Sequence, residues 1–209
     1  KAVAGAFNVG APQAHSRLVP SILTLREAPQ DYEAHIKEKG GLSCVLGSML
    51  LQAMVKFAED KIQPLLASWA SLSEAYILAL STDMAGSRVI ESFLASPTIP
   101  MKAKFKMVEK VTANAVHIAC DRYGSHIVEA CYKQANIDKK KDLVAVLADK
   151  DKDMKNSFFG NLVFKKCRVQ QYLDKEDDWM QTEVGNKKKK MLFEDILGDE
   201  FDSKLSTSG

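Results

Sequence analysis

The chain has 209 residues, 46% of them hydrophobic and 8% aromatic, which is enough apolar material for one or two cores or a run of stacked repeats. The formal net charge of +2 favours neither a polyanionic nor a polycationic partner for the chain as a whole. The sequence has no run of 18 apolar residues, no signal-peptide pattern at its start and no C-x-x-C pair, so we expect no membrane span, no metal site and no disulfide framework.

The first 41 residues form a region of their own. Pro12, Pro20 and Pro29 interrupt an amphipathic stretch that runs from about Ser16 to Leu25. Because prolines break a helical pattern at each of these places, we expect residues 1–41 to be a degenerate repeat or an inserted segment.

A short motif recurs along residues 42–170. It consists of Gly, a small polar residue, a variable residue, two apolar residues and a long polar or charged residue, and it begins at Gly47, Gly86, Gly124 and Gly160. The residues that follow these glycines are 39, 38 and 36 positions apart. A period of this length suits a two- or three-helix unit of a solenoid, whose units must stack because none can bury its apolar face alone.

Each unit also contains a helix that precedes its motif. Apolar residues recur at spacings of three to four, as expected of the first helix of a repeat. Turn-forming residues lie between the units, and no useful β-alternation occurs, so we predict an all-α chain. The first-helix positions are Leu65, Leu66, Trp69 and Leu72 in one unit and Phe105, Val108, Val111 and Ala115 in the next, and the turns are marked by Pro97, Pro100, Asn136 and Asp138.

The pattern changes after Cys167. A polar stretch at 174–178 is followed by Trp179, by the lysines at 187–190 and by an apolar segment at 191–197. This arrangement predicts a capping helix region over residues 171–200, and residues 201–209 are expected to be a frayed tail.

The positive charge is concentrated in one block. Residues 101–166 carry 14 Lys and Arg against 8 Asp and Glu, whereas the rest of the chain is net acidic. Such a block is typical of an electrostatic footprint for a nucleic acid.

The polar motif positions are predicted to share one helix face. With Ser125 at 0° on a helix that turns about 100° per residue, Glu129 lies at about 40° and His126 at about 100°, whereas Val128 and Ile127 fall on the other side. We therefore expect the three polar positions of each unit to project away from the core. In stacked units they form a continuous row, where hydroxyl, carboxylate and amide groups can reach base edges and a flat or apolar side chain can stack on a base.

The motifs at 86–91, 124–129 and 160–165 resemble the second-helix signature of Pumilio repeats. The C-terminal end, from Phe158 to Val169 with Trp179 and the basic segment at 187–197, resembles that of the nucleolar Pumilio-like ribosome-biogenesis proteins. This resemblance implies a curved right-handed superhelical solenoid, monomeric, that binds single-stranded RNA one base per repeat. It further implies a place in the nucleolus or nucleus, with precursor ribosomal RNA of the small subunit, and with it pre-ribosomal particles, as partner.

The resemblance also implies a role for each motif residue. In Pumilio repeats a Ser with Glu goes with guanine, a Ser with Gln goes with adenine, and the residue between them stacks on the base. Since RNA runs antiparallel to the repeats in this family, the implied core is 5′-GGA-3′. The implied residues are Ser48, Met49 and Gln52 for A, Ser87, Arg88 and Glu91 for the second G, and Ser125, His126 and Glu129 for the first G.

The last unit departs from this pattern. Asn161 holds the first position, Leu162 is an aliphatic residue at the stacking position, and Lys165 replaces Gln or Glu. We expect Lys165 to contact a phosphate or an acceptor edge, and we assign no base to this unit. With about four recognisable repeats and no initiator Met, the chain is expected to be the C-terminal part of a longer protein.

Two other function classes remain open at this point. A HEAT- or armadillo-like scaffold could bind a protein helix on a similar architecture, and an RNA-processing nuclease would cleave its target. The sequence lacks a Gly-rich phosphate loop, a G-x-S-x-G motif and an H-E-x-x-H motif, so we predict a protein that is not an enzyme and has no cofactor.

Overall fold

The computed structural model describes residues 12–29, 31–35, 42–186 and 188–189. Within these ranges the regular elements are all helical, and no strand occurs among them, which confirms the predicted all-α class. The elements are η1 (Pro12–Arg17), α2 (Leu18–Thr24), η2 (Tyr32–His35), α3 (Val45–Met54), η3 (Glu59–Lys61), α4 (Gln63–Ser71), α5 (Glu74–Thr82), α6 (Met84–Ala95), α7 (Met101–Thr112), α8 (Ala115–Cys120), α9 (Gly124–Gln134), α10 (Ile137–Asp149), α11 (Asp151–Asn156), α12 (Phe158–Lys166) and α13 (Val169–Asp174).

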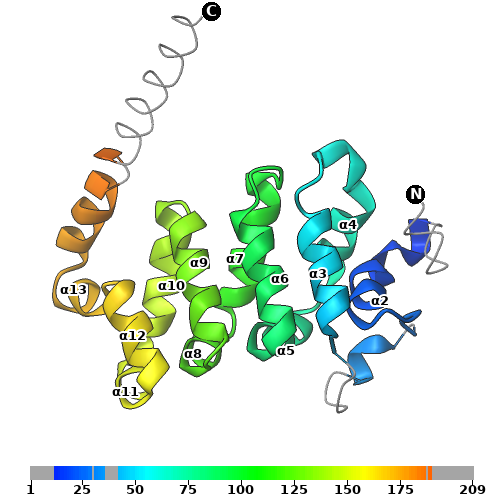
Figure 1. Cartoon of the computed structure of the whole chain (residues 1–209). Coiled ribbons are helices and arrows are strands. Elements are labelled where there is room, and N and C mark those ends of the chain that lie inside the picture. The colour runs from blue at the N-terminus through cyan, green and yellow to red at the C-terminus, as the bar shows by residue number, and fades with distance from the viewer. Residues whose placement is uncertain (1–11, 30, 36–41, 187, 190–209) are drawn as a thin grey trace, which may run out of the picture.

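The helices are arranged in rows of stacked three-helix units (Figure 1). The units are α4–α5–α6, α7–α8–α9 and α10–α11–α12. Their third helices α6, α9 and α12 lie side by side, and α3, the last helix of an N-terminal unit that precedes these three, lies beside α6. We call α3, α6, α9 and α12 the motif row because they carry the recurring motif. The first helices form a second row, α4, α7 and α10, which α13 extends, and the short helices α5, α8 and α11 form a third. The solenoid predicted from the repeat period is therefore confirmed.

The predicted first helices supply much of the core. Leu65 and Trp69 of α4 are buried, as are Val108 and Val111 of α7, and the motif row contributes its own apolar pairs between the rows. Burying each such side chain stabilises the folded chain by about 1.5–3 kcal/mol. A single unit leaves part of its apolar surface in water, so neighbouring units must stack to bury it.

The start of each motif helix is set by a cap three residues before the motif glycine. Asp83 accepts hydrogen bonds from the backbone N–H of Gly86 at 2.6 Å and of Ala85 at 3.1 Å. Asp121 does the same for Gly124, and Ser157 for Gly160. These side chains satisfy N–H groups that the helix leaves free at its first turn, so each cap fixes where its motif begins.

The motif glycine is required by close packing against the preceding short helix. A Cβ atom on Gly124 would lie 2.3 Å from the carbonyl oxygen of Ile118 in α8. Real Cβ atoms do not approach a backbone oxygen this closely, so the two helices can pack at this distance only because residue 124 has no side chain.

The N-terminal region packs like part of a unit with an insertion. A Cβ on Gly47 would lie 2.2 Å from the carbonyl oxygen of Ile22, so α2 lies against α3 as α8 lies against α9. The backbone N–H of Cys44 also donates to the carbonyl oxygen of Leu23 at 2.8 Å. The segment between α2 and α3 is much longer than the one between α8 and α9. The prediction of a degenerate repeat or an inserted segment over residues 1–41 stays a prediction.

The other end of the solenoid is covered by a helix over residues 176–186 that follows α13. Trp179 is fully buried, and Glu183 is paired with Lys140 of α10 at 2.6 Å. This helix contacts α10 of the last unit through that pair. Most of the basic and apolar segment at 187–197 and the expected tail at 201–209 lie outside the described residues. No helix in the described part of the chain has the length and apolar character needed to cross a bilayer.

Candidate nucleic-acid interface

The motif row presents one open surface, which we call the motif face. The residue after the motif glycine is the first motif position, the next residue is the second, and the last residue of the motif is the third. In every unit the second position is exposed, at Met49, Arg88, His126 and Leu162. The third position is half-buried in the first three units, at Gln52, Glu91 and Glu129, and exposed at Lys165. Because the four helices are neighbours in the order of the chain, these side chains form the continuous row that the repeat predicted.

The first motif position differs from the prediction. Ser48, Ser87 and Ser125 are only 2%, 3% and 4% exposed, and only Asn161 at the fourth unit is half-buried. The expectation that the serines project away from the core is therefore wrong. The serine lies at the edge of the polar face of its helix, and a residue at that edge is covered when the next helix of the row packs beside it.

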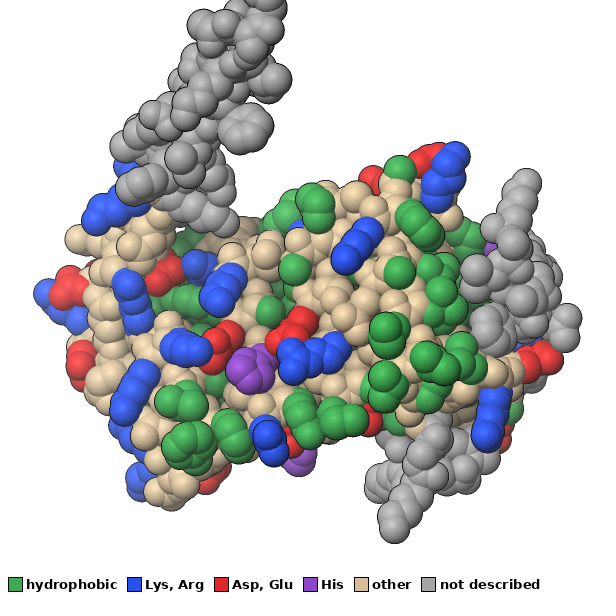
Figure 2. Space-filling model, viewed as in Figure 1, with side chains coloured by type: hydrophobic (Ala, Val, Ile, Leu, Met, Phe, Trp, Pro, Cys, Tyr) green, Lys and Arg blue, Asp and Glu red, His purple; other side chains and the backbone are tan. Residues whose placement is uncertain are grey.

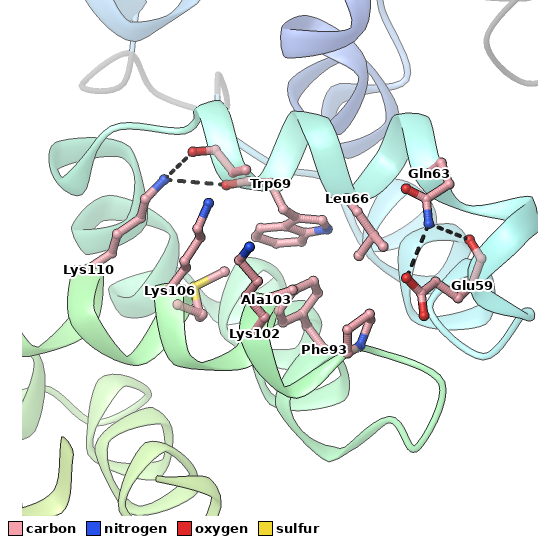
Figure 3. A pocket seen from close by; sticks show the side chains of 12 residues that line it. Glu59, Gln63, Leu66, Trp69, Phe93, Lys102, Ala103, Lys106 and Lys110 are labelled. Carbon is pink, nitrogen blue, oxygen red and sulfur yellow. Dashed lines mark hydrogen bonds between the residues drawn. The ribbon is translucent and has the colours of Figure 1, made fainter. Parts of the chain in front are cut away.

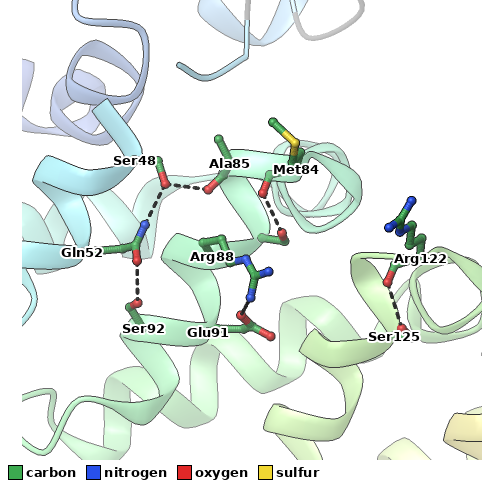
Figure 4. Close-up of polar contacts among 10 residues, drawn as sticks. Ser48, Gln52, Met84, Ala85, Arg88, Glu91, Ser92, Arg122 and Ser125 are labelled. Carbon is green, nitrogen blue, oxygen red and sulfur yellow. Dashed lines mark hydrogen bonds and ion pairs between the residues drawn. The ribbon is translucent and has the colours of Figure 1, made fainter. Parts of the chain in front are cut away.

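The serine hydroxyls bond to backbone instead (Figure 4). Ser87 donates to the carbonyl oxygen of Met84 at 3.3 Å and Ser125 to that of Arg122 at 3.2 Å, in both cases three residues earlier in the chain. Ser48 donates to the carbonyl oxygen of Ala85 in the next unit at 2.7 Å. Each hydroxyl still has lone pairs that can accept a hydrogen bond.

The α3 unit holds its amide in a network between units. The Gln52 side-chain N–H donates to the Ser48 hydroxyl at 3.0 Å, and its carbonyl oxygen accepts from Ser92 of α6 at 3.5 Å (Figure 4). The amide is therefore oriented before any ligand arrives. One N–H of the amide remains available as a donor.

The α6 unit pairs its charges within one helix. The Arg88 guanidinium lies 3.4 Å from the Glu91 carboxylate, one turn away, and both side chains reach solvent (Figure 4). An ion pair as exposed as this contributes little free energy, so breaking it to turn either side chain toward a ligand is easy.

The α9 unit pairs its carboxylate with the following unit. Lys166 of α12 lies 2.7 Å from Glu129, whose side chain is only 11% exposed. His126 stands exposed beside it. Lys166 follows the motif of the last unit and was not among the predicted site residues, because its pairing with Glu129 depends on how α12 packs against α9.

Charge is unevenly distributed over this side of the molecule. Figure 2 shows acidic, basic and histidine side chains gathered across the middle, over α6 and α9, whereas apolar side chains gather over α3. The apolar group comprises Val45, Leu46, Met49 and Leu50, all exposed. The central units thus offer hydrogen-bonding groups, and α3 offers an apolar surface next to one oriented amide.

A separate hollow lies between α4 and α7, on the row of first helices (Figure 3). It has a volume of 320 Å³, an apolar floor with Trp69 and Phe93, and lysines along one side. The Lys110 amine donates to the carbonyls of Ala70, at 2.8 Å, and Leu72 at the end of α4. Burial lowers the pKa of Lys110, but the contacts with these carbonyls satisfy its protons, so we assign this lysine a structural role in joining two units.

The described residues contain no group of three or more His, Cys, Asp or Glu side chains that could hold a metal ion. The cysteines among them are free thiols, and Cys131 and Cys167 are buried. The groups on the motif face are suited to recognition through hydrogen bonds, charge and stacking.

Solved structures share this architecture and include complexes with RNA. The structure of APUM23-GGAGUUGACGG superposes with a TM-score of 0.72 at 26% identity, and covers 87% of this chain and 34% of that chain. The Puf4 RNA-binding domain bound to the HO endonuclease 3′ UTR recognition sequence matches with a TM-score of 0.53 at 16% identity over 82% of this chain and 48% of that one. The similarity to the Puf4 domain shows the fold alone. Together the two structures confirm the predicted superhelical solenoid of Pumilio-like repeats.

Sequence relatives agree with the structural ones. Human nucleolar protein 9 is 27% identical over 155 residues, which are 74% of this chain and 24% of the relative. Pumilio homolog 23 of Arabidopsis thaliana is 30% identical over 135 residues, which are 65% of this chain and 18% of the relative. The chain thus spans about a quarter or less of the length of these relatives.

The family model of the NOP9-like PUF repeat domain matches residues 1–162, well over half of the chain and including the motifs of the first three units. The match also begins before α2, in agreement with the packing of α2 against α3 as part of a unit. This protein belongs to the NOP9-like PUF repeat family.

Proposed function

We propose that the motif face binds single-stranded RNA, with one nucleotide at each unit, and that it reads the core 5′-GGA-3′. The observation that carries this proposal is the alignment of four neighbouring helices that expose an equivalent pair of side chains each. The second-position side chain offers a surface for stacking, and the third-position side chain offers a hydrogen-bonding group to a base edge.

The base choice follows from donor and acceptor chemistry. A carboxylate accepts from the N1 and N2 donors of guanine but faces an acceptor at N1 of adenine, so Glu91 and Glu129 favour G. The amide of Gln52 can both donate and accept, which suits adenine. In this proposal the buried serines line the floor between units: Ser48 orients Gln52, and Ser87 and Ser125 accept from a base edge through their remaining lone pairs. No base is assigned to Asn161, Leu162 and Lys165.

Three observations support this function. The family is that of a PUF repeat domain. The RNA sequences in the names of the APUM23 structures, GGAGUUGACGG, GGAUUUGACGG and GGAAUUGACGG, all begin with GGA. Within the basic block at 101–166, Lys133, Lys165 and Lys166 lie on helices of the motif row and can supply charge for phosphates, whereas the lysines at 102–110 and 139–141 lie on α7 and α10 in the row of first helices.

The names of the relatives extend the proposal to a cellular setting. Proteins called nucleolar protein 9 occur among the relatives from human, mouse and yeasts. We accordingly propose that the longer protein containing this chain acts in the nucleolus as a monomer on precursor ribosomal RNA of the small subunit, within pre-ribosomal particles. Its role is to bind and shield RNA rather than to cleave it.

The experiment is fluorescence polarisation with short single-stranded RNAs that contain GGA or a scrambled core. Glu129→Gln should weaken binding to a first-position G and improve binding to A, with a change of about tenfold in their ratio. Glu74→Gln, on an exposed position of α5, is the matched control and should change neither. An unchanged base preference in Glu129→Gln would refute the assignment, and cleavage of the RNA in the same tubes would refute the non-enzymatic role.

The exposed apolar side chains of α3 favour one alternative, a scaffold that binds a protein helix. An apolar stripe at Leu46, Met49 and Leu50 can receive the apolar face of an amphipathic helix. The two functions separate in the same assay: a scaffold shows no preference between GGA and scrambled RNA, and Met49→Ala leaves its weak RNA binding unchanged.

A further inference from the structure

A pocket of 480 Å³ lies at the end of the motif row, beyond α12, and we call it the terminal pocket. It occupies the side of α12 that a further unit would cover if the row continued. Two of its lining residues, Asn161 and Lys165, belong to the motif face, so the pocket opens directly onto the proposed RNA path. Its lining is formed by Lys155, Asn161, Phe164, Lys165, Arg168 and Gln170.

Positive charge dominates this lining. Its three charged side chains, Lys155, Lys165 and Arg168, are all cations, and no acidic side chain is among the described residues that line it. Acidic groups do contact two of the cations from outside the lining: Asp151 lies 3.1 Å from Lys155, and Glu183 lies 3.9 Å from Arg168. Lys165 has no ion pair with any described residue, so the pocket keeps an excess of positive charge.

The backbone at Arg168 is held in a conformation that an arginine seldom adopts. Its φ is 56° and its ψ is 37°, in the left-handed region between α12 and α13. This conformation is unfavourable for residues with a side chain, and Gly or Asn would occupy it more easily. An arginine kept at such a position suggests a use for its guanidinium group.

The other lining residues favour a phosphate over a base or a peptide. Phe164 is 4% exposed and is covered by the Lys155 amine, 4.8 Å from the ring centroid, so it provides no platform for stacking. Asn161 adds amide N–H donors, and Gln170 has one N–H left, because its side-chain amide also donates to Asp174 at 2.8 Å. Lysine amines, a guanidinium fork and amide donors together match the oxygens of a phosphate group.

We infer that the terminal pocket binds a phosphate group of the RNA on the 5′ side of the GGA core. The placement rests on the proposed function, in which α9 receives the first G and α12 therefore receives the nucleotide before it. The phosphate is either the 5′-terminal monophosphate of that nucleotide or the diester that links it to the preceding one. Both offer the same oxygens to Lys155, Lys165 and Arg168.

The test compares four forms of a short RNA and one further reference RNA in fluorescence polarisation, all labelled at the 3′ end. The RNA carries one nucleotide before GGA and ends in a 5′-hydroxyl, in a 5′-monophosphate, or in an additional abasic nucleotide that supplies an internal diester without a base. The fourth form is the 5′-monophosphate with a scrambled core, measured beside its own 5′-hydroxyl counterpart. The quantity read is the ratio of affinities with and without the 5′ phosphate, which we expect to be about tenfold in the unmodified protein.

Two variants and one matched control locate the effect. Arg168→Gly removes the guanidinium and also relieves the backbone conformation, so the protein should fold as well as before while the phosphate ratio falls toward one. Lys165→Met should lower the ratio as well. Lys152→Met removes an equal charge from an exposed site of α11 that does not line the pocket, and it should leave the ratio unchanged.

The outcomes separate this inference from the proposed function. Equal binding of GGA and scrambled RNA contradicts the base reading, yet a tenfold phosphate ratio on both cores that Arg168→Gly abolishes still supports the pocket. A ratio near one in the unmodified protein, together with no gain in affinity from the abasic extension, overturns the pocket, whatever the core preference. A ratio that survives both Arg168→Gly and Lys165→Met also overturns it. A rise with the monophosphate alone identifies the terminal phosphate as the ligand, and a rise with the abasic extension identifies the diester.

Discussion

The α3 and α9 units have the same buried frame and different exposed surfaces. In both, a motif glycine lies against the backbone of a preceding helix, and a serine follows that is almost fully buried. On the open side, α9 carries His126 and a carboxylate paired across units, whereas α3 carries Met49 among other exposed apolar side chains. The comparison shows that packing restricts the inward positions, while the outward positions are free to differ and so can encode what each unit binds.

The largest effect is expected at the shared inward glycine. Gly124→Ala places a Cβ 2.3 Å from the Ile118 carbonyl oxygen, and we expect it to lower the free energy of unfolding by about 2–3 kcal/mol. Gly185→Ala is the control, because nothing lies within 4 Å of its Cβ, and it should raise stability by about 0.5–1 kcal/mol. Chemical denaturation measures both. Equal effects at the two sites would show that the close approach of α8 and α9 is not a packing constraint.

The next effect separates the two stacking positions. His126→Ala and Met49→Ala should each weaken binding of GGA RNA by about 1–3 kcal/mol, since each removes a surface on which a base stacks. Both side chains are exposed, so the melting temperature should stay within a few degrees. A loss at His126 without a loss at Met49 would restrict base reading to the central units and leave α3 to the scaffold function.

A smaller effect is expected for the pair between α9 and α12. Lys166→Met removes the partner of Glu129, and because Lys166 is 59% exposed we expect a stability loss of only about 0.5 kcal/mol. The freed carboxylate should discriminate G from A differently at the first position, whereas the preference at the second position, set by Glu91, stays unchanged. RNA competition with base changes at each position measures this. Equal shifts at both positions would show that Lys166 acts as general positive charge rather than through Glu129.

The smallest effect concerns the thiols and has no consequence for stability near neutral pH. Burial raises the pKa of Cys131, and it raises the pKa of Cys167 to about 12. In the native protein at pH 8 we therefore expect a thiol reagent to modify Cys44 and Cys120, with Cys131 and Cys167 reacting only after unfolding. Four fast thiols in the native protein would contradict the packing of α9 against α12.

The same two thiols predict how stability depends on pH. Above about pH 9 the unfolded chain releases thiol protons that the folded chain retains, so stability should fall as the pH rises through that range. The Cys131→Ala variant loses one of these groups and should show a shallower fall.

Much of the fold could be predicted from the sequence, and less of the site. The positions of Gly86, Gly124 and Gly160 revealed the repeat, and the apolar spacing around Leu65 and Val108 located the first helices. Asn136 was predicted as a break and is the cap of α10. The exposure of Ser87 and Ser125 was predicted wrongly, since a single helix gives the direction of a side chain but not what the neighbouring helix covers.

The sequence by itself determined the helical units, their number in this chain and the residue types on the open face, because helix periodicity and capping depend on residues a few positions apart. The tertiary structure decided which hydroxyls are buried, that Glu129 meets Lys166, and that three cations gather beyond α12. The first two features depend on how closely separate units stack, which brings together residues some forty positions apart. The third depends on how the chain turns from α12 into α13.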